Sequence, residues 1–166
     1  MSDRRGWAGE VNEVTMSVDS DVSLREVPAE NWYDCCQLGV SEDQEQFVEP
    51  NSVSIAQSRY ERTLRLKAIY LRQDLVGFAM YNTEPEELDG HWIYRLMIDK
   101  RYQRRGIARQ AMRSIIDEMA GLSDCRRIIA GYNPSNTAAR ALYASLGFED
   151  RGARFGKEVA VVLDLH

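Results

Sequence analysis

A glycine turn surrounded by arginines is the part of the sequence whose residue types most directly suggest chemistry. Residues 101–108 read RYQRRGIA. Where a strand ends in a tight turn and a helix begins, unpaired backbone N–H groups point in one direction, and the helix dipole adds partial positive charge. Arginines at that end of a helix oppose the usual preference for acids, yet four occur here: Arg101, Arg104, Arg105 and Arg109. The pattern predicts a polyphosphate site, with a solvated surface turn as the alternative.

A second motif, farther along the chain, favours the phosphate interpretation. Residues 136–148 read NTAARALYASLGF. With this motif the sequence resembles the GNAT superfamily of acyltransferases, whose signatures are Q/R-x-x-G-x-G/A after a strand and N-x-x-A-x-x-x-Y-x-x-x-G-F. The matching residues are Gln103, Gly106 and Ala108 for the first signature, and Asn136, Ala139, Tyr143, Gly147 and Phe148 for the second. Within the superfamily, residues 22–165 look most like bacterial spermine/spermidine (diamine) acetyltransferases.

The resemblance implies acetyl-CoA as co-substrate, and no metal. It implies that the backbone of Met97 and Ile98 pairs with the pantetheine arm, that N–H groups of residues 104–109 hold the pyrophosphate, and that Asn136 contacts the pantetheine. The full expected set of cofactor-binding residues is Met97, Ile98, Gln103, Arg104, Arg105, Gly106, Ile107, Ala108, Arg109 and Asn136. Asn136 also stands where it can cap the following helix, and the two roles are compatible.

Tyr143 is the expected catalytic residue, because the resemblance places it beside the CoA sulfur. A phenol there can act as a general acid that protonates the leaving thiolate, while amide N–H groups near strand 91–98 polarise the thioester carbonyl. Tyr143 also belongs to an i, i+3, i+4, i+7 stripe with Ala139, Leu142 and Leu146, which is typical of core packing. The surrounding motif favours catalysis over packing alone.

The general base is open. Related diamine acetyltransferases carry an acid in the strand before the CoA-contacting residues, and this chain has Tyr94 and Arg95 there. A water chain that ends on Glu84 or Glu42 could take the proton of the amine. His91 could also take it, although a histidine at a strand edge is more often an ordinary structural residue. Arg95 is expected to make a structural salt bridge.

Two acidic clusters predict a cationic acceptor. They comprise Glu42, Asp43, Glu45 and Glu49 in one segment, and Glu84, Glu86, Glu87 and Asp89 in another. A polyamine is a flexible polycation that carboxylates and aromatic rings can hold, and the resemblance places both segments near the acceptor cleft. Most acids in such runs are simply solvated. The expected substrate-binding residues are Glu42, Glu49 and Glu84, with Phe47, Tyr81 and Trp92 as candidate lining.

Hydrophobic periodicity predicts the elements that must position these residues. An amphipathic helix ended by Gly121 is predicted from the spacing of Ala108, Ala111, Met112, Ile115, Ile116 and Met119. Strands are predicted at 22–27, 65–72, 75–82, 91–98, 127–132 and 159–165, with a hairpin turn at Gln73-Asp74 and a short extra strand near Phe148. Other helices are predicted from Pro28 to Leu38, over 51–60 and over 136–146, and segment 41–50 is interpreted as irregular. With the resemblance, this order predicts an α/β fold: a mixed, mostly antiparallel central sheet with helices on both faces.

The composition is typical of one globular domain. The chain has 166 residues and a net charge of -5, which argues against general binding to nucleic acid or anionic membranes. Cys35, Cys36 and Cys125 form neither a disulfide framework nor a metal motif, so a reducing, cytoplasmic setting is expected. No apolar run approaches the length of a membrane span. We expect a disordered leader over 1–18 and a single domain over 19–166, and the resemblance leaves a homodimer open.

Together these observations predict an acetyl-CoA-dependent N-acetyltransferase that acts on a primary amine, with a polyamine such as spermine or spermidine as the first candidate. An aminoglycoside, an amino acid or a protein N-terminus would keep the same chemistry with a different acceptor. A catalytically silent acetyl-CoA-binding module is the third interpretation. It is supported by the missing acid at Tyr94 and opposed by the presence of Tyr143.

Overall fold

One sheet of seven strands organises residues 21–166, the part of the chain that the computed structural model describes. Across the sheet the strands follow the order β1-β2-β3-β4-β5-β7-β6. Their bounds are β1 Val22–Arg25, β2 Leu64–Leu71, β3 Asp74–Asn82, β4 His91–Ile98, β5 Arg127–Tyr132, β6 Glu149–Phe155 and β7 Glu158–Asp164. The helices are α1 Trp32–Gln37, α2 Asn51–Tyr60, α3 Ile107–Ala120 and α4 Thr137–Ser145, with the short 3-10 helices η1 Glu42–Phe47 and η2 Glu87–Asp89.

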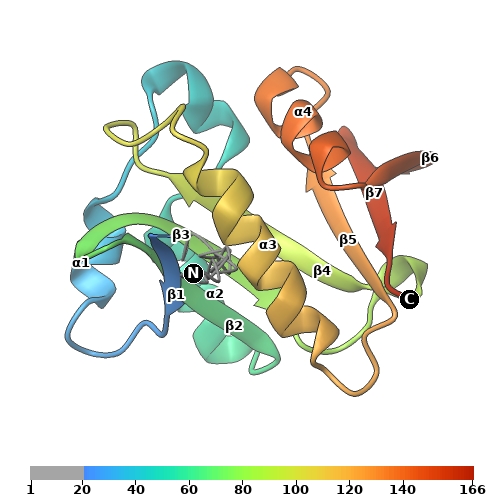
Figure 1. Ribbon diagram of the computed structural model, residues 1–166, viewed down its shortest axis with the longest axis horizontal. Helices are drawn as coiled ribbons and strands as arrows, with labels where there is room; N and C mark the ends of the chain where they lie inside the picture. The colour runs from blue at the N-terminus through green and yellow to red at the C-terminus, as the bar shows by residue number, and fades with distance from the viewer. Residues whose placement is uncertain (1–20) are drawn as a thin grey trace, which may run out of the picture.

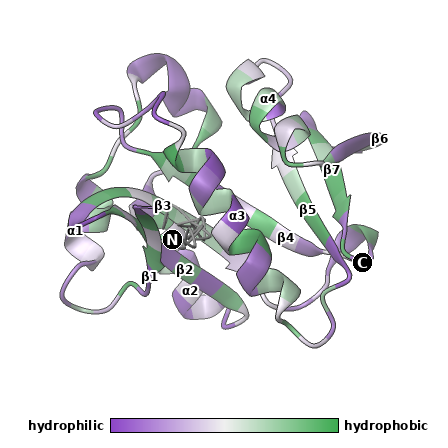
Figure 2. Ribbon diagram, in the orientation of Figure 1, coloured by the Kyte–Doolittle hydropathy of each residue, from purple (hydrophilic) through white to green (hydrophobic). Residues whose placement is uncertain are grey.

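Helices cover both faces of the sheet, which confirms the expected mixed α/β fold. On one face, α3 buries an apolar stripe that includes Ala111, Ile115 and Met119. On the other face, Cys35 of α1 packs in a second apolar cluster with Phe78 and other residues of the sheet. Figure 1 shows α3 crossing in front of the middle strands, and Figure 2 shows that α3 alternates between hydrophilic and hydrophobic residues. An amphipathic helix of this kind is stabilised mainly by burying its apolar stripe.

The sheet opens between β4 and β5. Among residues 21–166 β4 and β5 are the one parallel pair of neighbouring strands, and they pair only where His91–Ile93 faces Ile128–Ala130. All the remaining neighbouring pairs are antiparallel. Beyond this short ladder the two strands diverge toward the ends where α3 and α4 begin (Figure 1). The backbone edge of β4 from Tyr94 onward is therefore not covered by β5.

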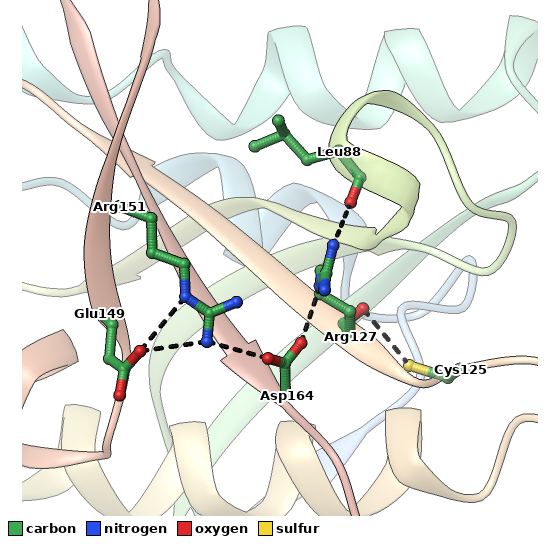
Figure 3. Close-up of polar contacts among 6 residues, drawn as sticks. All are labelled: Leu88, Cys125, Arg127, Glu149, Arg151 and Asp164. Carbon is green, nitrogen blue, oxygen red and sulfur yellow. Dashed lines mark hydrogen bonds and ion pairs between the residues drawn. The ribbon is translucent and has the colours of Figure 1, made fainter.

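A network of ion pairs braces the end of the sheet where β4 and β5 still pair. Arg127 at the start of β5 donates from Nε to Asp164 of β7 at 2.7 Å and from Nη1 to the Leu88 carbonyl at 2.9 Å. Arg151 of β6 joins Asp164 to Glu149 (Figure 3). Hydrogen bonds from Arg127, and then from Arg151, lower the pKa of Asp164. The charged carboxylate thus ties three strands and the η2 loop together at the base of the opening.

The two largest differences from the predicted elements lie in β6 and in the first helix. The extra strand expected near Phe148 is the seven-residue β6. Its sequence, EDRGARF, carries no apolar alternation because it is an exposed edge strand that pairs only with β7. The first helix begins at Trp32 rather than Pro28, because the Pro28 carbonyl accepts from Asn31 and Trp32 in a preceding turn.

Two smaller predictions are also wrong. The hairpin turn consists of Arg72 and Gln73, since Leu71 pairs with Asp74 and Arg72 takes a positive φ of 56°. The segment interpreted as irregular contains the 3-10 helix η1. The expected leader, residues 1–18, lies outside the described residues.

Candidate active site

Two pockets meet where β4 and β5 separate. One, of about 420 Å³, is lined by residues of the β4–α3 turn and is named the turn pocket. The other, of about 470 Å³, is lined by Glu45, Glu49 and Glu158 among others and is named the acidic pocket. The residues that line both are Phe47, Val48, Leu96, Asn136, Ala139 and Tyr143. The pockets are therefore adjoining halves of one cleft, with Tyr143 in the wall that they share.

The turn pocket opens at the N-terminus of α3, where backbone donors are unpaired. Gly106 precedes the helix with a φ of 76°, and no side chain caps the helix. Intrahelical bonding begins with Gln110, whose N–H donates to the Gly106 carbonyl at 3.2 Å, so the N–H groups of residues 107–109 lack intrahelical partners. Arg104 and Arg109 line the same pocket and form no ion pair with any residue from 21 to 166. These groups together favour a bound anion.

Further contacts hold this turn in shape. The Asp99 side chain is buried, and its Oδ1 accepts from the Arg101 N–H at 3.0 Å and from Arg101 Nε at 2.8 Å. Burial alone would raise the pKa of Asp99, but the bonds from Arg101 and from the Gly39 N–H together hold that pKa below its usual value. The Gln103 side chain donates to the Ile98 carbonyl at 2.9 Å and to Gln44 of η1 at 2.8 Å. The turn is therefore tied to β4 on one side and to η1 on the other.

Tyr143 carries a protonated phenol in the wall between the pockets. Its ring packs against Tyr132 and Phe148, with centroid distances of 6.2 and 5.4 Å. Burial, and secondarily the charge of Glu158, raise the pKa of Tyr143 to about 12. Its hydroxyl makes no hydrogen bond with any residue from 21 to 166. The phenol thus keeps its proton at neutral pH and can donate it to a bound molecule.

A β-bulge in β4 shapes the acidic pocket. Arg95 pairs with Met80 of β3 and Ile93 pairs with Tyr81, so Tyr94 is an extra residue on β4. Directly opposed residues share a face of the sheet, and Met80 packs on the α1 face, in the same apolar cluster as Tyr94. Tyr94 and Arg95 therefore lie on one face instead of alternating, and both line the acidic pocket. Re-aiming side chains in this way is what bulges commonly do beside active sites.

The acidic pocket gathers carboxylates from distant parts of the chain. Glu45 and Glu49 come from η1 and the segment that follows it, and Glu158 comes from the start of β7. None of the three forms an ion pair with a residue from 21 to 166. The Glu158 carboxylate lies over Gly131 of β5, where a Cβ atom would stand 2.8 Å from Oε2. A larger residue at position 131 would displace that carboxylate.

Comparison with known proteins identifies the family. Residues 26–148 match the "Acetyltransferase (GNAT) family". The chain belongs to this family. It is 29% identical over 150 residues to the spermine/spermidine N(1)-acetyltransferase of Bacillus subtilis (strain 168), a match that covers 87% of this chain and 99% of the relative.

Solved structures show the same fold. A spermidine N-acetyltransferase from Vibrio cholerae, in complex with CoA and spermine, superposes with a TM-score of 0.71 at 15% identity, over 88% of this chain and 96% of that one. An aminoglycoside acetyltransferase in complex with coenzyme A gives a TM-score of 0.72 at 14% identity, over 86% and 94%. As a GNAT enzyme the chain is an acetyl-CoA-dependent N-acetyltransferase. Its turn pocket fits that co-substrate, because N–H groups without intrahelical partners and two guanidinium groups without an ion pair among residues 21–166 suit a pyrophosphate.

Most of the predicted cofactor residues come together in this GNAT site. All except Arg105 line the turn pocket: Met97, Ile98, Gln103, Arg104, Gly106, Ile107, Ala108, Arg109 and Asn136. Arg105 instead donates to the Arg101 carbonyl at 3.3 Å and lies over the Tyr102 ring. Asn136 also caps α4, since its Oδ1 accepts from the Ala139 N–H at 3.1 Å.

The predicted acceptor residues are only partly brought together. Glu49 lines the acidic pocket, whereas Glu42 and Glu84 line neither pocket. The candidate lining residues divide similarly, because Phe47 and Trp92 line the acidic pocket and Tyr81 does not. The hydroxyl of Tyr81 donates to Glu118 of α3 at 3.1 Å, on the opposite face of the sheet. Sequence reasoning missed Glu158, which lies alone in the sequence at the start of β7 with no motif around it.

Two other expectations concern His91 and Arg95. His91 lines neither pocket; it is 1% exposed, and its Nε2 lies 3.3 Å from Asp124 Oδ1. The structural salt bridge expected for Arg95 is not formed with any residue from 21 to 166. Arg95 Nη1 instead donates to the Tyr94 carbonyl at 2.8 Å. The reason is that Arg95 lines the acidic pocket, where none of the glutamates lies within ion-pair distance of it.

Neither a metal centre nor a membrane span is found in the described part of the chain. No group of three or more histidine, cysteine, aspartate or glutamate side chains within residues 21–166 is arranged to hold a metal ion. No helix in the same range has the length and apolarity needed to cross a membrane.

Proposed function

We propose that this acetyltransferase acts on a primary amine of a small polycation, with spermine and spermidine as the first candidates. The observation that carries the proposal is the acidic pocket, whose glutamates have no ion-pair partner among residues 21–166 and which adjoins the turn pocket at Tyr143. A flexible polycation supplies ammonium groups for Glu45, Glu49 and Glu158. The name of the Bacillus subtilis relative supports the same class of acceptor.

The turn pocket is the proposed site of acetyl-CoA, which supplies the thioester and its leaving thiolate. The N–H groups of residues 107–109, with the guanidinium groups of Arg104 and Arg109, hold the pyrophosphate. The uncovered edge of β4 at residues 97–98 and the side chain of Asn136 position the pantetheine arm. Gln103 supports that edge through its bond to a β4 carbonyl.

Tyr143 is the proposed general acid. Its hydroxyl is unpaired within residues 21–166, and its raised pKa keeps it protonated. As the new amide bond forms and the carbon–sulfur bond breaks, the phenol gives its proton to the sulfur and regains one from solvent. The carboxylate of Glu158 disfavours a lasting phenolate, which promotes that return.

The proton of the acceptor amine is proposed to leave through Tyr94. This residue lines the acidic pocket, and its hydroxyl donates in a short hydrogen bond to Glu86, whose other oxygen accepts from Asn82 at 2.6 Å. Burial, and then the bond to Glu86, raise the pKa of Tyr94 well above its usual value. Tyr94 therefore passes a proton on instead of holding a negative charge: Oη accepts the amine proton as its own proton moves to Glu86. The Glu86 carboxylate thus serves as the final proton acceptor, and Tyr94 relays the proton to it from the position at which related diamine acetyltransferases carry an acid.

Release of free thiol from acetyl-CoA tests the proposal. The panel of acceptors is spermine, spermidine, putrescine, an aminoglycoside and a short peptide. We expect turnover on the polyamines. Turnover on the aminoglycoside or the peptide alone would assign a different acceptor, and CoA binding without turnover on any amine would favour a binding module.

We also propose a cytoplasmic location. Cys35, Cys36 and Cys125 are all free thiols, as is usual in a reducing compartment. The homodimer stays a prediction, which sedimentation equilibrium would test.

A further inference from the structure

Arg95 is the one cationic side chain, among residues 21–166, that lines the acidic pocket. Its Nη1 donates to a main-chain carbonyl at 2.8 Å, and its Nε is buried without any hydrogen-bond partner. Other arginines of the structure, such as Arg127 and Arg154, donate their Nε or Nη groups to carboxylates. Two donor groups of Arg95, the buried Nε and Nη2, therefore make no hydrogen bond with any residue from 21 to 166.

The position of this guanidinium is built into the sheet. Arg95 follows the bulged residue of β4, and its cross-strand partner is Met80. Its face is set by regular alternation along β4, because Met97, two residues on, packs in the apolar cluster on the α1 face. The sheet thus places a cation in a pocket that otherwise contains acids. Neighbouring acids do not neutralise it, because Glu45, Glu49 and Glu158 all lie beyond ion-pair distance of Arg95.

Nη2 is the donor of Arg95 that a ligand in the pocket can reach. It makes no hydrogen bond with any residue from 21 to 166 and is not sealed, whereas Nε is sealed from solvent. A charge-assisted hydrogen bond from a guanidinium group to a carboxylate is among the stronger polar contacts in proteins. A simple polyamine has no acceptor oxygen to offer and would bring a further positive charge near Arg95.

We propose that, among polycationic amines, the enzyme prefers an acceptor that carries a carboxylate as well as its amino groups, and that Arg95 binds this carboxylate. The class is a diamino acid, or a polyamine that bears one carboxylate. Glu45, Glu49 and Glu158 take the ammonium groups, while Arg95 orients the molecule by its oxyanion. The inference rests on the proposed function, since it assigns the acidic pocket to the acceptor.

Matched pairs of acceptors that differ only by a carboxylate test the proposal. The pairs are ornithine with putrescine, lysine with cadaverine, and 2,4-diaminobutyrate with 1,3-diaminopropane. Equilibrium binding of each to the CoA-bound protein is measured by calorimetry, for the wild type and for Arg95→Met, with Arg113→Met on the exposed face of α3 as the control. In at least one pair we expect the wild type to bind the carboxylated member 10- to 100-fold more tightly, the range of a charge-assisted pair.

The variants separate this role from a structural one. Arg95→Met should lose the preference and bind the plain diamine as well as the wild type does, Arg95→Lys should keep part of the preference, and Arg113→Met should behave as the wild type. Unchanged CoA affinity in Arg95→Met shows that the turn pocket is intact. Equal or tighter wild-type binding of the plain diamine in all three pairs would overturn the inference. Thiol release, measured in parallel, reports on the proposed function separately, because carboxylate-dependent binding without turnover contradicts only the acetyl transfer to these amines.

Discussion

The turn pocket and the acidic pocket adjoin, but they are built by different means. About half of the turn pocket is lined by one continuous stretch, residues 96–109, which also supplies its anion-binding backbone N–H groups. The acidic pocket collects side chains from η1, β4, β5, α4 and β7. Most side-chain substitutions leave backbone donors in place, whereas a single substitution removes a carboxylate. We therefore expect few positions to affect the affinity for acetyl-CoA and many positions to affect the affinity for the acceptor.

Tyr143 should give the largest effect, because it belongs to both pockets. Tyr143→Phe removes the phenolic proton with little change in volume, so kcat should fall about 100-fold or more, the range for a lost general acid. The affinity for acetyl-CoA should stay near that of the wild type. Rapid kinetics of thiol release and calorimetric titration measure the two quantities.

The matched control is Tyr81→Phe, which removes a buried hydroxyl that bonds to Glu118 and lies outside both pockets. It should leave kcat unchanged. Equal kcat in Tyr143→Phe and the wild type would show that Tyr143 only packs.

Gly106 is the position at which the backbone-built pocket can be broken. Valine is strained at a φ of 76°, and its side chain would add bulk at a residue that lines the turn pocket. Gly106→Val should weaken acetyl-CoA binding about 100-fold, the order of magnitude for strain and blocked approach together. Calorimetry measures the loss.

Gly152→Val separates strain from blocking. Gly152 has a φ of 92°, also faces open space, and lies on β6 outside both pockets. This control should be destabilised in a melting experiment without losing acetyl-CoA affinity. If both variants bound the co-substrate as the wild type does, the pyrophosphate would not lie at this turn.

A single carboxylate of the acidic pocket should have a smaller effect. Glu49→Gln should raise the KM for spermidine about 3- to 5-fold and leave the KM for acetyl-CoA unchanged, since an exposed ion pair contributes at most about 1 kcal/mol. Asp43→Asn, on η1 but outside both pockets, should change neither constant. A rise in the KM for acetyl-CoA in Glu49→Gln would contradict the assignment of the two substrates to separate pockets.

The smallest effect concerns pH. The pKa of Tyr143, raised to about 12 by burial and then by Glu158, keeps the general acid protonated, so kcat at saturating acceptor should not decline up to about pH 10. Glu158→Gln removes the charge that raises this pKa, so any alkaline decline should begin at a lower pH. A decline below pH 10 that Tyr143→Phe abolishes would contradict the assigned protonation.

The two pockets also differ in how far the sequence predicts them. The anion-binding part of the turn pocket could be predicted, because residues 103–109 are contiguous and Gly106 marks the turn, whereas the wall that η1 and its flanking residues supply comes from a distant segment with no motif. Of the carboxylates of the acidic pocket only Glu49 could be predicted, along with the lining residues Phe47 and Trp92, because Glu158 reaches the pocket through strand order. That Tyr94 and Arg95 lie on the same face depends on the bulge in the register between β3 and β4, and a bulge of this kind has no marker in a single sequence. The length of edge strand β6 also cannot be predicted from the sequence, because its exposed residues show no apolar alternation.

The central claim is that one cleft holds the co-substrate and the acceptor on either side of Tyr143. The most direct test is the binding of a bisubstrate analogue in which spermidine is joined to CoA through an acetyl bridge. The account predicts competition with both substrates and binding at least about 100-fold tighter than that of CoA, because the second half binds intramolecularly. Substitution of Glu45, Glu49 and Glu158 by glutamine should remove most of that gain. Binding no tighter than that of CoA alone would contradict the account.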